Sequence, residues 1–133
     1  MKSSGLSRLT PYLLSVLRIV AASLFIAHGA QKLFAYPVSS PRPSVPLQSK
    51  LGAAGVLEAG GGALMLVGLF SRPVAFLLSG EMAFAYFTQH APNGRWPILN
   101  GGELAVLYCF IWLFFVAAGP GPLSLDAVIR KRA

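Results

Sequence analysis

The chain has 133 residues, of which 55% are hydrophobic and 11% charged, and its formal net charge is +7. This composition departs from that of soluble globular proteins toward that of membrane proteins, and the positive charge suits anionic lipid head groups, so no nucleic-acid partner is expected. A single cysteine, Cys109, excludes an internal disulfide and a C-x-x-C redox pair, so any redox chemistry must come from a cofactor or a partner.

Four apolar runs predict an all-α membrane protein with one domain over residues 1–133. Each run is near the ~20 residues that a helix needs to cross a ~30 Å hydrocarbon core. In lipid the backbone must satisfy its own hydrogen bonds, so the runs are helices and not strands. The expected spans, which form an antiparallel four-helix transmembrane bundle, are residues 12–36, 51–70, 73–90 and 99–118.

A secretory signal peptide is the competing interpretation of the first run, because Lys2 and Arg8 precede it. The run is too long for that role, contains Arg18, and is followed by no polar mature domain.

The connections differ in character along the chain. Residues 37–50 form a Pro-rich outer loop that is expected to be extended. Residues 91–99 form a second outer loop that either lies flat or dips into the membrane. The basic tail 123–133 is either a short interfacial helix capped by Ser124 or a frayed segment.

Cationic residues are distributed unevenly between the two sides of this arrangement. Six lie in the two tails and the turn between spans two and three, against three in the other two loops, or four when Lys32 is included. The six are Lys2, Arg8, Arg72, Arg130, Lys131 and Arg132, and the three are Arg42, Lys50 and Arg95. The bias predicts cytoplasmic termini in a multi-pass protein of the inner (plasma) membrane.

The second span carries small residues at near-helical spacing, at Gly52, Gly55, Ala59 and Gly62. Such a stripe lets another helix approach closely. Glu58 lies beside the stripe, so its side chain is expected to face protein and not lipid.

Three of the four acidic residues, Glu58, Glu81 and Glu103, fall inside separate apolar runs. A charge at the bilayer centre costs at least ~2.5 kcal/mol, so these carboxylates are expected to face one another or the cations Lys32, His28 and Arg18. With a rise of ~1.5 Å per residue, polar groups from all four spans reach the outer half of the membrane. The candidate catalytic residues are Glu81, Glu58 and Glu103, and the candidate ligand-binding residues are His28, Gln31, Lys32 and Asn100.

Structural alternatives accompany these assignments. Buried ion pairs often only fix helix register. His90 is expected to be a residue of the pocket rim, and the aromatic residues of the later spans fit a lipid surface or core as well as a quinone slot. Helical di-iron proteins use Glu-x-x-His pairs, and no Glu here has His three residues on, so no metal is expected.

Several segments together resemble the DoxX family. They are FIAHGAQKLF, GVLEAGGGALMLVGLFSRP, SGEMAFAYFTQHAPNGRWPILNGGELAVLY and AAGPGPLSLD, which extend from about Leu17 to Asp126. The resemblance implies a small four-helix protein of the inner membrane. Similar proteins include membrane subunits associated with thiosulfate:quinone oxidoreduction, and others proposed to link superoxide dismutase and a sulfurtransferase to a membrane oxidoreductase complex.

Two functions are expected from these features. In the first, the chain is the membrane subunit of a redox-linked complex, and its outer-half polar pocket binds a quinone head group or another small ligand with a polar head. A protein partner then brings the electrons, and any activity is that of an oxidoreductase subunit. In the second, the chain is a non-catalytic membrane scaffold that docks soluble or membrane partners, or further copies of itself.

We predict that a cysteine introduced at Ser3 is protected from a membrane-impermeant thiol reagent in intact cells and reacts only after the inner membrane is opened. The reason is the excess of cations beside both tails. The parent protein, with Cys109 alone, is the control. Labelling of the new thiol from the periplasmic side of intact cells would refute the orientation.

Overall fold

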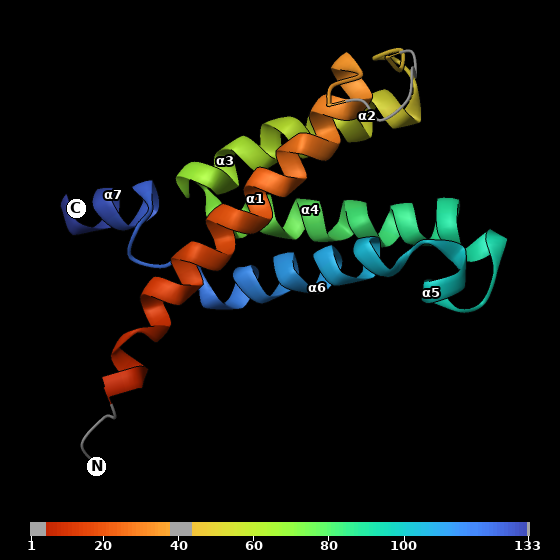
Figure 1. The fold of residues 1–133 in the computed structure, drawn as a ribbon. Helices are drawn as coiled ribbons and strands as arrows, with labels where there is room; N and C mark the ends of the chain where they lie inside the picture. The colour runs from red at the N-terminus through yellow and green to blue at the C-terminus, as the bar shows by residue number, and fades with distance from the viewer. Residues whose placement is uncertain (1–4, 38–43, 133) are drawn as a thin grey trace.

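The computed structural model describes residues 5–37 and 44–132, which form helices joined by turns without any strand (Figure 1). In chain order the helices are η1 (Gly5–Arg8), α1 (Thr10–Phe34), α2 (Lys50–Val56), η2 (Leu57–Gly61), α3 (Gly62–Val67), α4 (Ser71–Ala85), η3 (Tyr86–His90), η4 (Ala91–Asn93), α5 (Pro97–Asn100), α6 (Glu103–Ala118) and α7 (Leu125–Arg132). The all-α class predicted from the sequence is confirmed.

Helices are found at the positions of all four predicted spans, with small differences in where they begin and end. The second span is one continuous helix of 18 residues, Lys50–Val67, made of α2, η2 and α3. The fourth begins at Glu103 and not at residue 99, because Gly101 adopts a φ of 71° and ends α5. By length and composition, α1 and the Lys50–Val67 helix are the two that could cross a membrane, and α6 is a shorter apolar helix.

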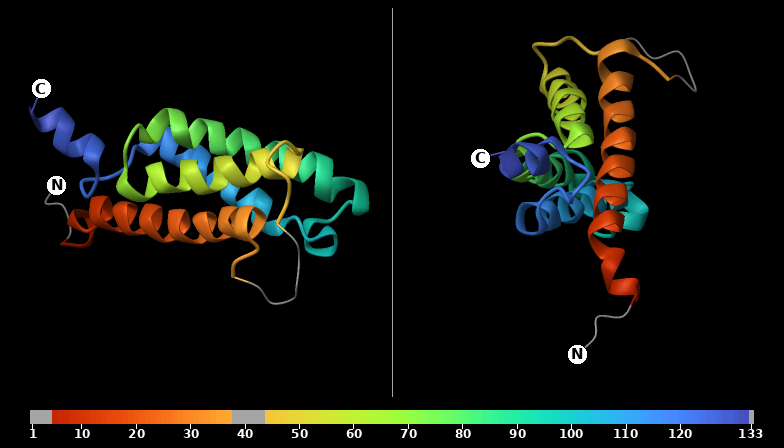
Figure 2. Two further views of the ribbon diagram at one scale, coloured as in Figure 1. Left: turned by 90° about the horizontal axis from the view of Figure 1, so that it is seen from above. Right: turned by 90° about the vertical axis from the view of Figure 1, so that its left-hand side faces the viewer.

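The helices pack as two antiparallel pairs. Helix α1 lies along α2, η2 and α3, and α4 lies along α6 (Figures 1 and 2). The described ends of the chain, η1 and α7, lie at one end of the molecule, which we call the inner end; the opposite end is the outer end (Figure 2).

Small residues allow the close contact between α1 and the second helix. A Cβ atom on Gly29 would lie 2.5 Å from the main-chain nitrogen of Ala59, and one on Gly62 would lie 2.8 Å from Cγ1 of Ile26. Gly55, Ala59 and Gly62 of the small-residue stripe therefore face α1, and Gly52 lies against Pro46 and Leu47.

Large apolar side chains fill the space between the two pairs. Phe25, Met65, Leu78, Trp112 and Phe115 are at most 1% exposed. The rings of Phe25 and Trp112 meet nearly at right angles, with centroids 5.3 Å apart, a favourable geometry for aromatic pairs.

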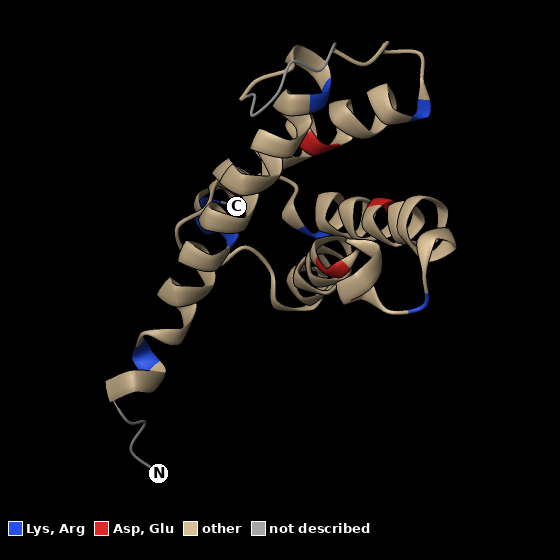
Figure 3. Cartoon of the chain, turned by 45° about the vertical axis from the view of Figure 1, so that its right-hand side comes forward, with Lys and Arg blue, Asp and Glu red and all other residues tan. Residues whose placement is uncertain are grey.

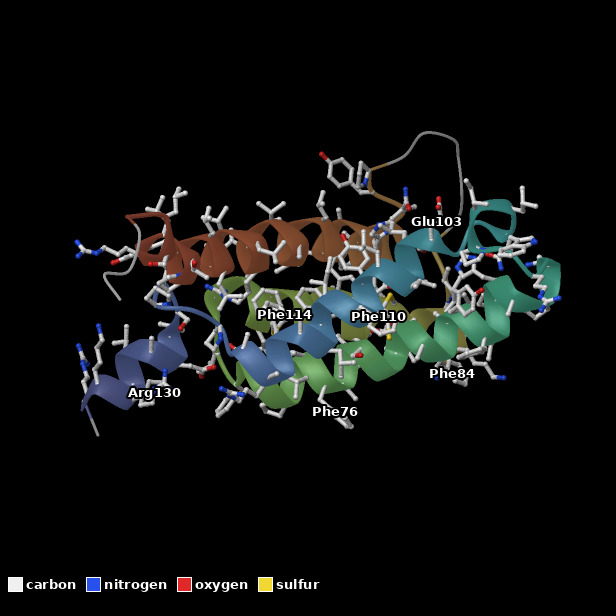
Figure 4. The ribbon with its side chains drawn as sticks, turned by 90° about the horizontal axis from the view of Figure 1, so that it is seen from below. Phe76, Phe84, Glu103, Phe110, Phe114 and Arg130 are labelled. Carbon is white, nitrogen blue, oxygen red and sulfur yellow. The ribbon has the colours of Figure 1, made fainter. Side chains whose placement is uncertain are left out.

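The outward faces of α4 and α6 are also apolar. Phe76, Phe84, Phe110 and Phe114 project away from the packed helices (Figure 4), and each is more than half exposed. Soluble monomers rarely expose so much apolar surface, so these faces suit a lipid environment.

Arg18 on α1 is fully buried at the inner end and donates hydrogen bonds to main-chain carbonyls. Nε donates to Pro120 at 2.9 Å, and Nη2 donates to Leu123. Nη1 donates to Met65 and Leu66, in the last turn of α3, where carbonyls lack their full set of intrahelical partners. The expectation that Arg18 serves the glutamate carboxylates is therefore wrong.

Asp126 and Ser124 organise the same end. The Asp126 carboxylate accepts hydrogen bonds from the main-chain N–H groups of Phe70 and Ser71 at 2.9 and 2.8 Å, and so caps α4. Ser124 Oγ accepts from the main-chain nitrogen of Ala127 at 3.2 Å and caps α7. The C-terminal tail is thus a capped helix and not a frayed segment over its described residues, and its interfacial placement stays a prediction.

We predict that Arg18→Met and Arg18→Lys each lower the free energy of unfolding in detergent by about 3 kcal/mol or more, because hydrogen bonds from a charged group each contribute about 1.5–3 kcal/mol. Lysine is not expected to rescue the fold, since its single ammonium cannot reach carbonyls in both α3 and the segment before α7.

The control is Arg8→Gln, an exposed cation in η1, which should change stability little. Unfolding curves followed by circular dichroism measure both effects. An Arg18→Met variant as stable as the parent would contradict the assigned role.

Candidate functional site

A pocket of about 260 Å³ opens at the outer end between α1, η2, α4, η3 and α6. Its polar lining comes from His28, Lys32, Glu58 and His90. The remaining lining residues are Phe25, Met82, Ala85, Gly101, Leu104, Ala105 and Tyr108. The helices thus bring together polar groups that are far apart in sequence, as the depths of these groups along the spans predict.

An ion pair forms one wall of the pocket. Lys32 Nζ donates a hydrogen bond to Glu58 Oε1, and the side chains are 27% and 3% exposed. It is the one salt bridge among residues 5–37 and 44–132, where charged positions on the packed helices are few (Figure 3). The second carboxylate oxygen of Glu58, Oε2, is buried and has no hydrogen-bond partner within the described residues.

Two of the polar residues lie on π-helical turns. Glu58 belongs to η2 and His90 to η3. A π-helical turn is wider than an α-helical one and changes the direction of the side chains after it, and such turns are frequent at functional sites. Both interruptions in these long helices occur at the level of the pocket.

His90 is held in a defined orientation. Its Nδ1 lies 3.2 Å from the carbonyl oxygen of Asn100, and its ring stacks on Tyr86 at a centroid distance of 6.4 Å. A carbonyl can only accept a hydrogen bond, so Nδ1 carries the proton and neutral His90 presents Nε2 as an acceptor.

Aromatic side chains form the floor of the pocket. The centroid of the Tyr108 ring lies 5.0 Å from that of Phe25 and 6.2 Å from that of His28. Tyr108 also stacks on Trp112, with the ring centroids 6.0 Å apart. This packing fixes the position of His28 relative to Lys32, which lies on the next turn of α1 and forms the ion pair with Glu58.

Glu81 lies close to the ion pair but on another face of α4. It interacts electrostatically with Glu58 and Lys32, yet it lines a separate groove of about 430 Å³ between α2 and α4. Both of its carboxylate oxygens are buried and lack a hydrogen-bond partner in the described part of the chain. The groove between α2 and α4, which is more apolar than the pocket, therefore contains a carboxyl group whose oxygens accept no hydrogen bond from the described residues.

Three other predicted site residues lie outside the pocket. Gln31 is exposed and donates to the carbonyl oxygen of Pro37 at 3.1 Å. Glu103 is exposed in the first turn of α6 and projects outward from that helix (Figure 4). Asn100 is buried, but its side chain bonds the main chain of Gly94 and Gly102, so it shapes the loop that carries Gly101 into the pocket.

The expected convergence of three carboxylates on one cavity is thus wrong: of the three, Glu58 alone lines the pocket, Glu81 lines the neighbouring groove, and Glu103 is exposed. Glu103 begins a new helix after the break at Gly101, and that break turns it outward. The chemical roles assigned to the seven residues stay predictions.

Sequence reasoning does not assign His90 or Tyr108 to the lining. It places His90 at the rim and indicates no role for Tyr108. The signal available for His90 is its place in the polar segment QHAPNG, where a helix ends and the chain turns back. No comparable signal distinguishes Tyr108 from the other aromatic residues of α6.

The described residues contain no group of three or more His, Cys, Asp or Glu side chains that could hold a metal ion. The polar groups of the pocket are therefore considered as hydrogen-bonding and proton-transfer groups.

Comparisons with known proteins agree with the resemblance noted in the sequence. The DoxX family model matches residues 13–91. An uncharacterized protein of Haemophilus influenzae is 44% identical over 133 residues, covering 97% of this chain and 99% of that protein. A second uncharacterized protein of the same organism is 32% identical over 68 residues, covering 51% of this chain and 45% of its own length. No solved structure gives a significant match. The chain belongs to the DoxX family of membrane-associated proteins.

Proposed function

We propose that this chain is a four-span protein of the inner membrane, with both termini in the cytoplasm, that binds a quinone head group in the outer pocket as the membrane subunit of a redox-linked complex. The observation that carries the proposal is the pocket itself, where the Lys32–Glu58 pair, His28 and His90 surround a floor of aromatic rings.

The size of the pocket favours a head group of one ring. Pockets for drug-sized ligands have volumes of about 300–1,000 Å³, and this one is about 260 Å³. A planar ring with oxygen atoms on opposite edges would place one face on the floor formed by Phe25 and Tyr108, and its oxygens toward the polar wall.

The polar groups match such a ring in number and kind. Lys32 and His28 can donate hydrogen bonds to a ring oxygen, and His90 Nε2 can accept one from a ring hydroxyl. Glu58 Oε2 is buried without a partner, and buried polar atoms without partners call for a functional explanation. A bound quinone supplies two-electron, two-proton chemistry, which no side chain of the protein provides.

An apolar groove beside the pocket supports access from the bilayer. The groove lies between α1 and α6, has a volume of about 160 Å³, and shares Leu104 and Tyr108 with the pocket. Its other lining residues are all aliphatic, and they continue toward the inner end along Leu17 and Ile111. A head group in the pocket could leave its apolar tail in this groove.

Proton movement is assigned to Glu58 and Glu81, which line the pocket and the neighbouring groove. In this proposal Glu58 exchanges a proton with the ligand oxygen, and Glu81 holds a proton on the other side of η2. Electrons come from a soluble or membrane partner, because the chain has a single cysteine and no C-x-x-C pair. A non-catalytic scaffold is the second candidate, favoured by the fact that the Lys32–Glu58 pair joins α1 to η2 and could serve packing alone.

We predict that Ala85→Leu lowers the affinity for a short-chain benzoquinone at least ten-fold, because Ala85 lines the pocket and a larger side chain would occupy the ring position. Binding is measured on detergent-purified protein by quenching of Trp112 fluorescence in a Trp96→Phe background, since Trp112 stacks on the pocket residue Tyr108.

Ala63→Leu is the matched control, because Ala63 is exposed on α3 and outside the pocket. Unchanged affinity in Ala85→Leu, or no quinone binding by the parent protein, would reject the pocket assignment and favour the scaffold.

We predict that Glu81→Gln folds normally and loses most quinone reduction by membranes that contain the complex. Gln is nearly isosteric but cannot exchange a proton, and no bonded partner is stranded because the Glu81 oxygens have none among the described residues. Glu103→Gln, the same change on an exposed carboxylate, is expected to lose less turnover. Melting temperature is measured beside turnover. A large loss of stability, or full activity, in Glu81→Gln defeats the proton role.

A further inference from the structure

We propose that the inner end carries a binding site for the phosphate of an anionic glycerophospholipid, formed by Arg72, Arg130 and Lys131. This inference rests on one part of the proposed function, the placement of the helices in a membrane, and is independent of the quinone pocket.

Two adjoining hollows define the site. They have volumes of about 250 and 350 Å³ and share Arg72, Pro120 and Arg130 in their linings. Lys131 lines the larger one, together with the glycine- and proline-rich segment after α6. Arg130 projects from α7 at the inner end of the molecule (Figure 4).

Arg72 is fixed in place before any ligand binds. Its Nη1 donates to the carbonyls of Val116 and Ala117 at 2.5 and 2.8 Å, at the end of α6. Gly119 has a φ of 78°, and a Cβ there would lie 3.3 Å from Nη2, so this glycine leaves room for the guanidinium. Nε and Nη2 have no hydrogen-bond partner among the described residues and remain available to an anion.

The cations around the larger hollow outnumber the acidic groups near them. Neither Arg130 nor Lys131 forms a salt bridge within the described residues, and no acidic side chain lines this hollow. Asp126 lines the smaller hollow. Burial raises its pKa, but hydrogen bonds from Ser71 and Phe70 and the nearby Arg130 outweigh that effect, so its pKa is lowered and it stays anionic. The larger hollow is therefore the place for a phosphate.

A lipid is favoured over free phosphate by the apolar side of the hollow. Pro11 and Leu14 of α1 complete its lining, and the exposed side chains of Leu13 and Leu17 continue from them along the outside of α1. A phosphate held by the three cations would have its acyl chains against this apolar surface. Basic pockets at the cytoplasmic ends of membrane helices bind anionic head groups in this way.

The test compares dioleoyl-phosphatidylglycerol with dioleoyl-phosphatidylcholine, each added to the full-length protein in a non-ionic detergent at fixed ionic strength. Native mass spectrometry and the melting temperature report binding. The anionic lipid is expected to bind and to raise the melting temperature, and the zwitterionic lipid is not. Arg130→Gln with Lys131→Gln is expected to weaken binding of the anionic lipid about thirty-fold, the effect of two cations near a membrane surface.

Arg8→Gln with Arg132→Gln is the matched control. It removes the same formal charge from the same end but neither residue lines the hollows, so affinity should be nearly unchanged. Equal binding of the two lipids, equal loss in the control, or equal stabilisation by inorganic phosphate would each overturn the proposal.

Three readouts, which are quinone binding, carbonate extraction and lipid selectivity, separate this inference from the proposed function. If Ala85→Leu and the parent bind no quinone while phosphatidylglycerol selectivity persists, the lipid site stands alone. If alkaline carbonate extracts the protein from membranes, the membrane placement and the lipid site both fall. If the protein stays in the membrane but shows no lipid selectivity, this inference alone is wrong.

Discussion

The guanidinium of Arg18 holds the inner end of the molecule together, because it joins α1 to main-chain carbonyl groups at the end of α3 and in the segment between α6 and α7. Burying a cation among apolar helices is unfavourable unless its donors are paired, and here four hydrogen bonds to main-chain oxygens provide the pairing. Charged side chains also bond the main chain at two other helix ends: Asp126 accepts hydrogen bonds at the start of α4, and Arg72 donates them at the end of α6.

The outer end is built differently. Its polar groups are side chains that meet across helices, and some of their oxygens have no partner within the described residues, on Glu58 and on Glu81. The two ends therefore differ in the kind of polar contact: side chains bond main-chain carbonyls at the inner end, whereas carboxylate oxygens without a partner in the described chain lie beside the pocket and the groove toward the outer end. The two π-helical turns carry Glu58 and His90, which line the outer pocket.

Part of the candidate site could be predicted from spacing. Lys32 and His28 lie four residues apart on one helix, and Glu58 adjoins a small-residue stripe, so their orientation toward protein could be derived from helical periodicity. Glu103 could not be placed in this way, because the prediction extended one straight helix through Gly101 and Gly102. Each residue added to or removed from a helix rotates the remainder of that helix by about 100°, so a single break changes the face on which a carboxylate lies.

The sequence by itself determined the membrane character, the helical class, the approximate positions of the helices and the family, since these depend on composition, on the lengths of apolar runs and on motifs read along one chain. Only the tertiary structure decided which polar groups meet. Arg18 bonds main-chain carbonyls and not carboxylates, His90 enters the pocket lining, and Arg72 comes beside Arg130 and Lys131. These contacts depend on the rotation of each helix about its axis and on where helices end, which are set by packing between segments distant in sequence.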